Sequence, residues 1–325
     1  MTRGDDLTFS ATTKNELSRL PVINNCCAIA ELAAIIRMSG TIQITGVKEI
    51  NLRFTTENAA IARRIFSILK TIYDTEVEVM VRRNKQLKKN YNYLVIVNDK
   101  EISKGILKDV GFTRGQSSIL NPNYSIPEKL VANRCCRRSY IRGAFLGGAS
   151  ISNPEKTYHL EFVTSKKDHA KDLSKIVNSF DLNSKIVIRK ESYVIYLKEG
   201  EQIVDLLNIM GAHQALLKLE DIRVLKNIRN NINRIVNCET ANLGKTVDAS
   251  MRQIGNIKFI EEQIGLDKLP ANLREIAELR VENDDASLKE LGMMLDPPVG
   301  KSGVNHRLRK IEQLAEELRG DKKDV

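Results

Sequence analysis

The 325 residues are enough for about two domains, and a hydrophobic content of 42% allows proper cores, which excludes a wholly disordered chain. Lysine and arginine number 51 against 41 aspartates and glutamates, so the formal net charge is +10. This excess favours a polyanionic partner, nucleic acid before membrane, because no basic amphipathic anchor accompanies it. The chain lacks an apolar run of membrane-spanning length and a secretory signal at its start. We therefore expect a cytoplasmic protein without a membrane partner.

The cysteines form two adjacent pairs, Cys26–Cys27 and Cys135–Cys136, with Cys238 apart from them. No pair has the C-x-x-C spacing that is typical of a zinc site or a thioredoxin motif. We expect reduced cysteines that are buried as small apolar side chains, with no metal and no cofactor.

An internal repeat occupies the first two thirds of the chain. The cysteine pairs lie 109 residues apart, and each precedes a segment rich in small residues, 28–42 and 137–151, that is typical of a helix turning into a strand. The following apolar patterns match at nearly the same offset. They predict strands at 52–56, 77–81 and 93–97 and helices at 61–69 and 102–108, against strands at 160–164, 185–189 and 193–197 and helices at 173–177 and 201–210. The predicted unit is α-β-β-α-β-β-α, present twice.

Small residues occupy matching places in the first helix of each copy, and they would let two helix backbones approach closely. They are Ala33, Ala34, Gly143 and Ala144. Residues 32–40 and 141–149 therefore resemble the signature helices of the LAGLIDADG homing-endonuclease fold. The resemblance implies that these paired helices form the core of the interface between two pseudosymmetric halves.

The same resemblance bears on catalysis. In that family each signature helix ends with an acidic residue, and the two acids hold the catalytic divalent cations. The corresponding residues here are Ser39 and Gly148, and the sixth motif position, often acidic too, is Arg37 in one copy and Leu146 in the other. Hard divalent cations need carboxylate or carbonyl oxygens. We therefore expect no catalytic residues, no metal and no enzymatic activity.

From Leu216 the apolar period is helical. The pattern predicts one helix around 219–236 and a second from about Thr240 to Ile264, which Gly265 ends. The polar face of the first is rich in arginine and asparagine. That face is interpreted either as solvated, or as contacting phosphate or the N-terminal half.

The last sixty residues predict a compact unit of three helices. Residues 272–275 and 287–290 have the form of capping boxes, and Asp296-Pro297-Pro298 ends the second helix. The third helix follows Ser302, with Val304 and Leu308 among its apolar set. The arrangement is that of a helix-turn-helix.

Polar and basic side chains remain on the third helix once its apolar set is removed. They suit base edges and phosphates, because a recognition helix presents its N-terminal residues to the major groove and its free amides to phosphate. The candidate DNA-binding residues are Lys301, Ser302, Gly303, Asn305, His306, Arg307, Arg309 and Lys310. Gly303 is interpreted as permitting close approach of phosphate.

The whole chain resembles the WhiA family, bacterial sporulation and cell-division regulators. The resemblance rests on residues 13–17, 236–242, 279–283, 287–291 and 302–310. It implies a transcriptional regulator that binds double-stranded DNA, acts in cell division and chromosome segregation, and in some bacteria in sporulation. Such a protein would be associated with the nucleoid.

The expected architecture is therefore α+β, a pseudosymmetric LAGLIDADG-like domain followed by an all-α helix-turn-helix domain. The expected boundaries are 13–110 and 111–213 for the repeats, 214–265 for a helical connector and 266–325 for the DNA-binding domain. Candidate secondary phosphate contacts are Arg82, Arg83, Lys88, Lys89, Arg134, Arg137 and Arg138.

Three alternatives stay open. An active LAGLIDADG homing endonuclease would need acids at Ser39 and Gly148. An RNA-splicing cofactor is disfavoured by the helix-turn-helix, because the major groove of A-form RNA is too narrow for a helix. The N-terminal half could also be a sensor, or a docking platform for another transcription or division protein, without touching nucleic acid.

Overall fold

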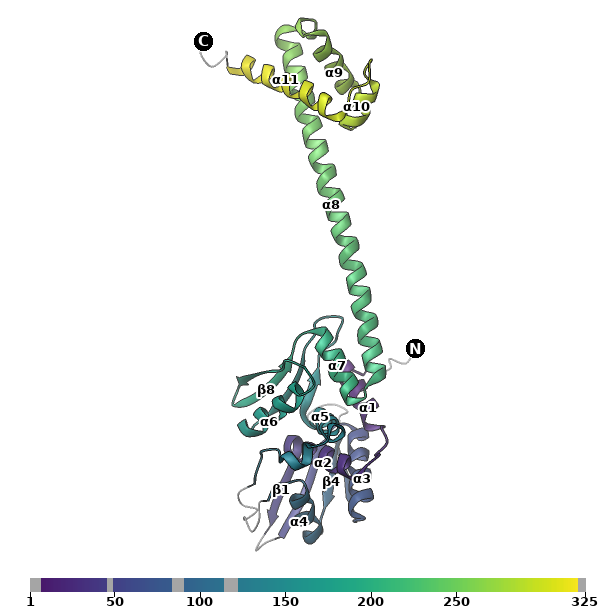
Figure 1. Cartoon of the computed structure of the whole chain (residues 1–325), viewed down its shortest axis with the longest axis vertical. Helices are drawn as coiled ribbons and strands as arrows, with labels where there is room; N and C mark the ends of the chain where they lie inside the picture. Colours follow the sequence, from purple (N-terminus) through teal and green to yellow (C-terminus); the bar gives the residue numbers. More distant parts are fainter. Residues whose placement is uncertain (1–6, 46–48, 84–90, 114–121, 321–325) are drawn as a thin grey trace. The chain divides into compact units, whose positions relative to one another are not determined.

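The computed structural model describes residues 7–45, 49–83, 91–113 and 122–320. The chain forms two compact units, 1–226 and 227–325, which we describe separately (Figure 1). Helix α8 (His213–Ile264) begins in the first unit and ends in the second.

The first unit contains the predicted repeat. One copy comprises α2 (Asn25–Ser39), β1 (Gly40–Thr45), β2 (Glu49–Thr56), α3 (Ala59–Tyr73), β3 (Glu78–Arg83), β4 (Tyr91–Val97) and α4 (Lys100–Asp109). The other comprises α5 (Arg134–Gly148), β5 (Ala149–Ile151), β6 (Leu160–Thr164), α6 (Lys167–Asn178), β7 (Lys185–Arg189), β8 (Ser192–Leu197) and α7 (Gly200–Met210). The α+β prediction and the order of elements are confirmed. Helix α1 (Phe9–Ser18), which the sequence patterns did not predict, precedes them.

Each copy folds its strands into one antiparallel sheet within the described residues. The orders are β1-β2-β4-β3 and β5-β6-β8-β7, so the two sheets have the same topology. In β2, Leu52 and Phe54 are fully buried against the helices, and Arg53 between them points to the other face. We call that other face of the first sheet its open face.

Helices α2 and α5 lie side by side at the centre of the unit (Figure 1). A Cβ at Gly143 would fall on the carbonyl oxygen of Glu31, and it would lie 3.0 Å from the Cβ of Ala34. Glycine at 143 is therefore required by the close approach of the two backbones. This confirms the role predicted for the small residues of the signature helices.

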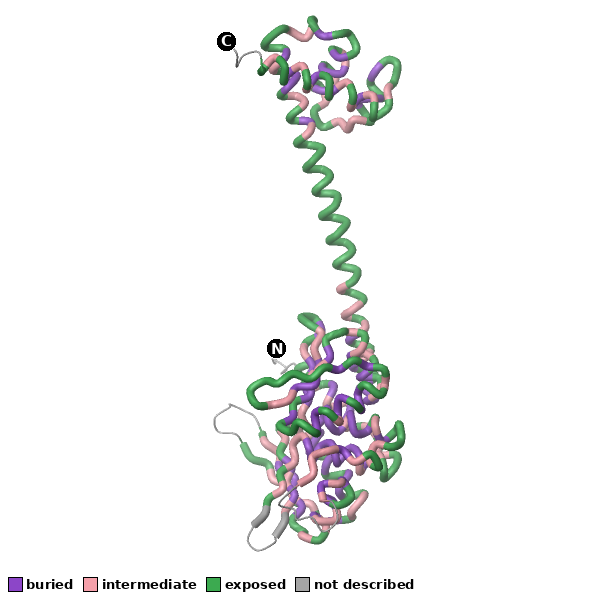
Figure 2. The backbone as a smooth tube through the Cα atoms, turned by 60° about the vertical axis from the view of Figure 1, so that its left-hand side comes forward, coloured by how far each residue is buried: buried purple, intermediate pink, exposed green. Residues whose placement is uncertain are grey.

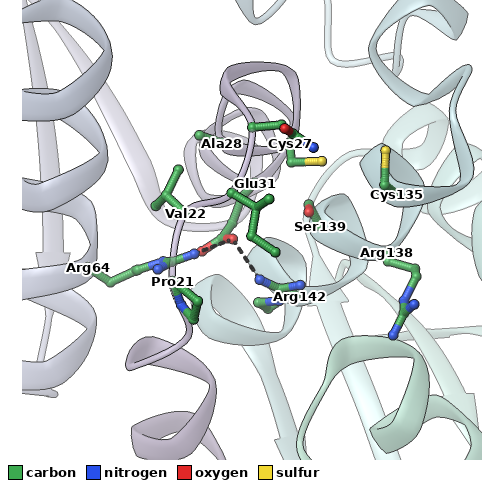
Figure 3. Close-up of a pocket in the computed structure, with 12 residues that line it drawn as sticks. Pro21, Val22, Cys27, Ala28, Glu31, Arg64, Cys135, Arg138, Ser139 and Arg142 are labelled. Carbon is green, nitrogen blue, oxygen red and sulfur yellow. Dashed lines mark hydrogen bonds and ion pairs between the residues drawn. The ribbon is translucent and has the colours of Figure 1, made fainter.

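A buried ion group crosses the same interface. Glu31 on α2 is 1% exposed and accepts two hydrogen bonds from Arg64 of α3, at 2.7 and 2.9 Å. Arg142 of α5 lies 3.5 Å from the second carboxylate oxygen (Figure 3). Burying a charge without partners would be costly, so the two guanidinium groups are what permits Glu31 to be buried here.

The sixth signature positions are also buried. Arg37 donates to the carbonyl oxygens of Ala33, Tyr124 and Ser125 and lies over the ring of Phe112, at 4.5 Å from its centroid. Leu146 belongs to the hydrophobic core. Arg37 therefore binds the segment between α4 and α5, which joins the two copies of the repeat.

The expectation of buried cysteines is wrong for most of them. Cys136 is buried, Cys27 is half-buried, and Cys26, Cys135 and Cys238 are exposed. The paired cysteines lie in the first turns of α2 and α5, where the helices meet solvent, and Cys238 lies on α8.

The prediction of two helices between 219 and 264 is wrong, because α8 is continuous from His213 to Ile264. Residues 237–239 contain neither glycine nor proline, so nothing breaks the backbone hydrogen bonding there. Apolar side chains along the middle of α8 are exposed, among them Ile228, Ile235 and Leu243 (Figure 2).

The second unit packs α9 (Ala271–Glu282), α10 (Leu288–Met294) and α11 (Lys301–Gly320) against the end of α8. Ile257 and Ile260 of α8 are fully buried in its core, so this domain needs residues before 266. The capping box at Ser287 and Glu290 is confirmed. The one predicted at 272–275 is wrong, because α9 begins at Ala271 and its N-cap residue is Pro270, which has no side chain that could accept a capping hydrogen bond.

Candidate nucleic-acid interface

Helix α11 is seated in the second unit by one face. Val304, Leu308, Ile311 and Ala315 are buried against α8, α9 and α10, as their helical spacing predicts. The opposite face carries exposed Ser302, His306 and Arg309 at intervals of three and four, with half-buried Asn305 beside them. These four residues form one line over the first turns of α11, and we call them the outer line.

The turn before α11 is held by Val299. Its backbone N–H donates to the carbonyl oxygen of Gly292 on α10 at 2.8 Å. A Cβ at Gly292 would fall on the carbonyl oxygen of Val299, and a Cβ at Gly303 would fall on a methyl of its side chain. Packing against Val299 therefore offers an explanation for glycine at 303 besides close approach of phosphate.

Arg307 is also placed differently from the prediction. Its guanidinium lies 3.7 Å from the carboxylate of Glu275 and donates to the carbonyl oxygen of Asn272 at 3.4 Å, both on α9. The side chain is 21% exposed. Helical spacing puts residue 307 between the buried and outer faces, so Arg307 joins α11 to α9 and does not belong to the outer line.

The remaining predicted residues, Lys301 and Lys310, also lie at the surface of α11. Lys301, Ser302 and Lys310 are exposed, and Lys301 and Ser302 lie in the first turn, where backbone N–H groups are free of helical partners. Gln313 was missed by the sequence reasoning. It is exposed and continues the outer line four residues beyond Arg309, a spacing that could have identified it.

The loop between α9 and α10 is held in place by side-chain hydrogen bonds. Arg280 is 2% exposed and donates to the carbonyl oxygens of Asn283 and Ala286, at 3.3 and 2.7 Å. Burial lowers the pKa of its guanidinium. Ser250 of α8 donates to the carbonyl oxygen of Asp284 in the same loop at 2.6 Å. The loop is thereby tied to both α9 and α8.

Ser39 and Gly148, which stand where the LAGLIDADG family carries its acids, each contact neighbouring groups of the first unit. Ser39 donates its hydroxyl to the carbonyl oxygen of Ile35 at 3.2 Å. A Cβ at Gly148 would lie 2.6 Å from the end of the Met38 side chain. Neither residue supplies a carboxylate, and an acid at 148 would have to displace Met38.

The arginines of β3 lie on opposite faces of the first sheet. Arg53 pairs with Ile96, and Ile96 pairs with Glu78, so these three share the open face. Arg82 lies four residues beyond Glu78 on the same strand and also faces the open side, whereas Arg83 faces the other way. Arg53 is thus a cation that the sequence reasoning missed. The predicted contacts Lys88 and Lys89 lie outside the described residues.

Arg134, Arg137 and Arg138 lie within the first turns of α5. Arg138 donates to the carbonyl oxygens of Asn208 and Ile209, where α7 ends, at 3.3 and 2.8 Å. Arg134 and Arg137 lie over the Phe180 ring, at 5.3 and 5.9 Å from its centroid. A 15-residue helix is about 20 Å long, so this cluster is at the end of α5 opposite Gly148.

The fold and this site define a class of protein: a pseudosymmetric LAGLIDADG-like unit joined in one chain to a helix-turn-helix unit. Family models agree along the chain. The WhiA N-terminal LAGLIDADG-like domain matches residues 25–113, the WhiA LAGLIDADG-like domain 137–229, and the WhiA C-terminal HTH domain 232–315.

Curated relatives are equally consistent. The chain is 59% identical over 314 residues to a probable cell division protein WhiA of Alkaliphilus metalliredigens, covering 97% of this chain and 99% of the relative. It is 56% identical to that of Clostridium botulinum, covering 96% and 99%. The chain belongs to the WhiA family.

A crystal structure of full-length DUF199/WhiA from Thermatoga maritima is similar, with a TM-score of 0.58 and 26% identity over 96% of this chain and 99% of that one. Within the described residues, no helix combines the length and apolar character needed to cross a membrane.

Proposed function

We propose that this chain is a sequence-specific DNA-binding regulator that reads the major groove with α11. The observation that carries the proposal is the outer line, in which Ser302, Asn305, His306 and Arg309 lie on a helix whose other face is buried. Arginine suits the edge of guanine and asparagine that of adenine, while Lys301 and the free amides of the first turn suit phosphate. The names of the family model and of the curated relatives support this reading.

The base-reading role of Arg309 can be tested with the full chain and a duplex that it selects from random DNA. Arg309→Ala should weaken binding to that duplex by about 1–3 kcal/mol and relax the preference at one base pair. Arg252→Ala is the matched control, because Arg252 is exposed on α8 in the same unit and carries the same charge. If both variants lose the same affinity in anisotropy titrations, the effect of Arg309→Ala comes from charge alone, and Arg309 does not contact a base.

We also infer that the chain does not cut DNA. Ser39 and Gly148 supply no carboxylate, and Met38 fills the place where a side chain at 148 would project. Supercoiled plasmid incubated with the purified chain and Mg²⁺ or Mn²⁺ should therefore stay intact. Nicking that follows the protein through purification and stops with EDTA would contradict this expectation.

The names of the relatives support a proposal for the cellular role. The relatives are named as probable cell division proteins, and we propose that this chain also acts in cell division and chromosome segregation, at the nucleoid, with sporulation added in bacteria that sporulate. A transcription or division protein could dock on the first unit. Mapping the bound sites across the genome would test the regulatory role.

A further inference from the structure

The two cysteine pairs, 109 residues apart in the chain, meet in space. Cys26 and Cys27 lie in the first turn of α2, and Cys135 and Cys136 lie in the first turn of α5, beside it. The sulfur atoms of Cys26, Cys27 and Cys136 all lie within 4.8 Å of one another. Cys135, the neighbour of Cys136 in the chain, lines the same pocket as Cys27 (Figure 3).

These spacings suit one thiophilic cation. Zinc bound by four thiolates is tetrahedral with Zn–S distances of about 2.3 Å, which puts the sulfur atoms about 3.8 Å apart. The three sulfur atoms within 4.8 Å need only small rotations to reach that spacing. The thiol of Cys135, which lines the same pocket as Cys27, would have to turn towards them to complete the set. A disulfide would join the sulfur atoms in pairs, whereas here three lie within 4.8 Å of one another.

The surroundings suit the charge of such a site. A divalent cation with four thiolates carries a net charge of −2. Two helix N-termini point their unpaired N–H groups towards it, and Asn24 and Asn133, the N-cap residues, form no side-chain cap. Arg138 and Arg142 line the same pocket as Cys27 and Cys135. Burial raises the pKa of the Cys27 and Cys136 thiols in the metal-free chain, and these positive groups would offset part of that cost once a cation is bound.

We propose that Cys26, Cys27, Cys135 and Cys136 bind one zinc-like divalent cation through four thiolates, and that this cation clamps the N-terminal ends of the two signature helices. The site lies at the opposite ends of α2 and α5 from Ser39 and Gly148, the former catalytic positions. Four protein ligands leave no open coordination position, so the site is structural. Its loss would free the two halves to move relative to each other.

Cobalt is the probe, because a tetrathiolate gives Co²⁺ strong visible bands and sulfur-to-metal charge-transfer bands. The full chain, reduced and freed of metal, should develop these bands with an end point of one Co²⁺ per chain, and Zn²⁺ should abolish them. Cys135→Ser should lose them, and the exposure of Cys135 makes this variant able to fold. Cys238→Ser, which removes an exposed cysteine on α8, is the matched control and should behave as wild type.

A second measurement follows the clamp itself. Zn²⁺ should raise the melting temperature of wild type and Cys238→Ser but not of Cys135→Ser, because a ligand that binds only the folded state stabilises it. The proposal is overturned if reduced protein gives no tetrathiolate bands, or if Cys135→Ser keeps them unchanged. It is also overturned if the reduced chain ignores Co²⁺ and instead forms disulfides between α2 and α5 in air.

Discussion

His169 on α6 is fully buried in the second copy of the repeat and joined to its neighbours by two hydrogen bonds. One ring nitrogen lies 3.0 Å from the hydroxyl of Tyr140, and the other lies 3.2 Å from the hydroxyl of Thr164. Burial, and secondarily the positive charge of Arg37, lowers the pKa of His169 to about 3. The imidazole is therefore neutral in the folded chain at neutral pH.

This pKa predicts a loss of stability in mild acid. Below about pH 6.5 His169 binds a proton in the unfolded chain but not in the folded chain. The free energy of unfolding therefore decreases as the pH falls towards 3. The slope for one such group is about 1.4 kcal/mol per pH unit. Urea unfolding at pH 7 and at pH 5 should show wild type losing more stability than His169→Gln. Equal losses in the two proteins would mean that His169 accepts a proton while folded.

At the scale of elements, the turn between α10 and α11 depends on the fit of Val299 between two glycines. Gly303→Ala should destabilise the second unit by about 1–3 kcal/mol, the usual cost of overpacking, because the new methyl meets a stiff β-branched side chain. Val299→Ala in the same chain should restore most of that loss, because it removes both γ-methyls of Val299, including the one that the new methyl would meet. Thermal unfolding of the three variants measures both effects.

Phosphate approach at Gly303 would give a different pattern. Gly303→Ala would then weaken DNA binding while leaving the melting temperature alone, and Val299→Ala would not rescue it. Gly300→Ala serves as control, because a Cβ at that neighbouring glycine would meet nothing within 4 Å.

Local patterns predicted most of the elements, for a physical reason. Strands β2 and β6 are buried on one face only, so their apolar residues alternate and the strands are recognisable from the chain. Helices α3, α6 and α11 each bury one stripe, which gives spacings of three and four. Repetition at a fixed offset then identified the pseudosymmetric pair, because each copy had to satisfy the same packing.

Features set by long-range packing were not predictable. The thiols of Cys27 and Cys136 lie close together because α2 and α5 lie side by side, and neither cysteine pair has a metal spacing within its own segment. Gly303 looks the same in the sequence whether it faces a phosphate or Val299. The sequence pattern predicts that Arg307 contacts DNA, whereas in the structure its guanidinium lies beside Glu275 of α9. Cys136 and Glu275 are distant in the chain from Cys27 and Arg307, whereas Val299 is only four residues before Gly303 and meets it because of the shape of the turn.

At the scale of the whole molecule, the question is whether the first unit adds phosphate contacts to those of the second. Its open face carries Arg53 and Arg82 beside Glu78, and Arg83 lies on the other side of the same strand. Arg138 is engaged with the end of α7, which makes the α5 cluster a poorer candidate. We therefore expect any phosphate contact by the first unit to come from the open face.

The salt dependence of DNA binding tests this for the full chain against a fragment of residues 227–325, whose hydrophobic core is self-contained. Each phosphate contact adds roughly 0.9 to the slope of log K against log salt, so the full chain should give the steeper slope with the same sequence preference. Arg53→Gln with Arg82→Gln should flatten that slope by up to about 2, one contact each. Arg83→Gln, which removes a charge from the opposite face of the strand, should leave it unchanged. Equal slopes for chain and fragment would show that the first unit does not touch DNA, and would leave its open face as a surface for another protein.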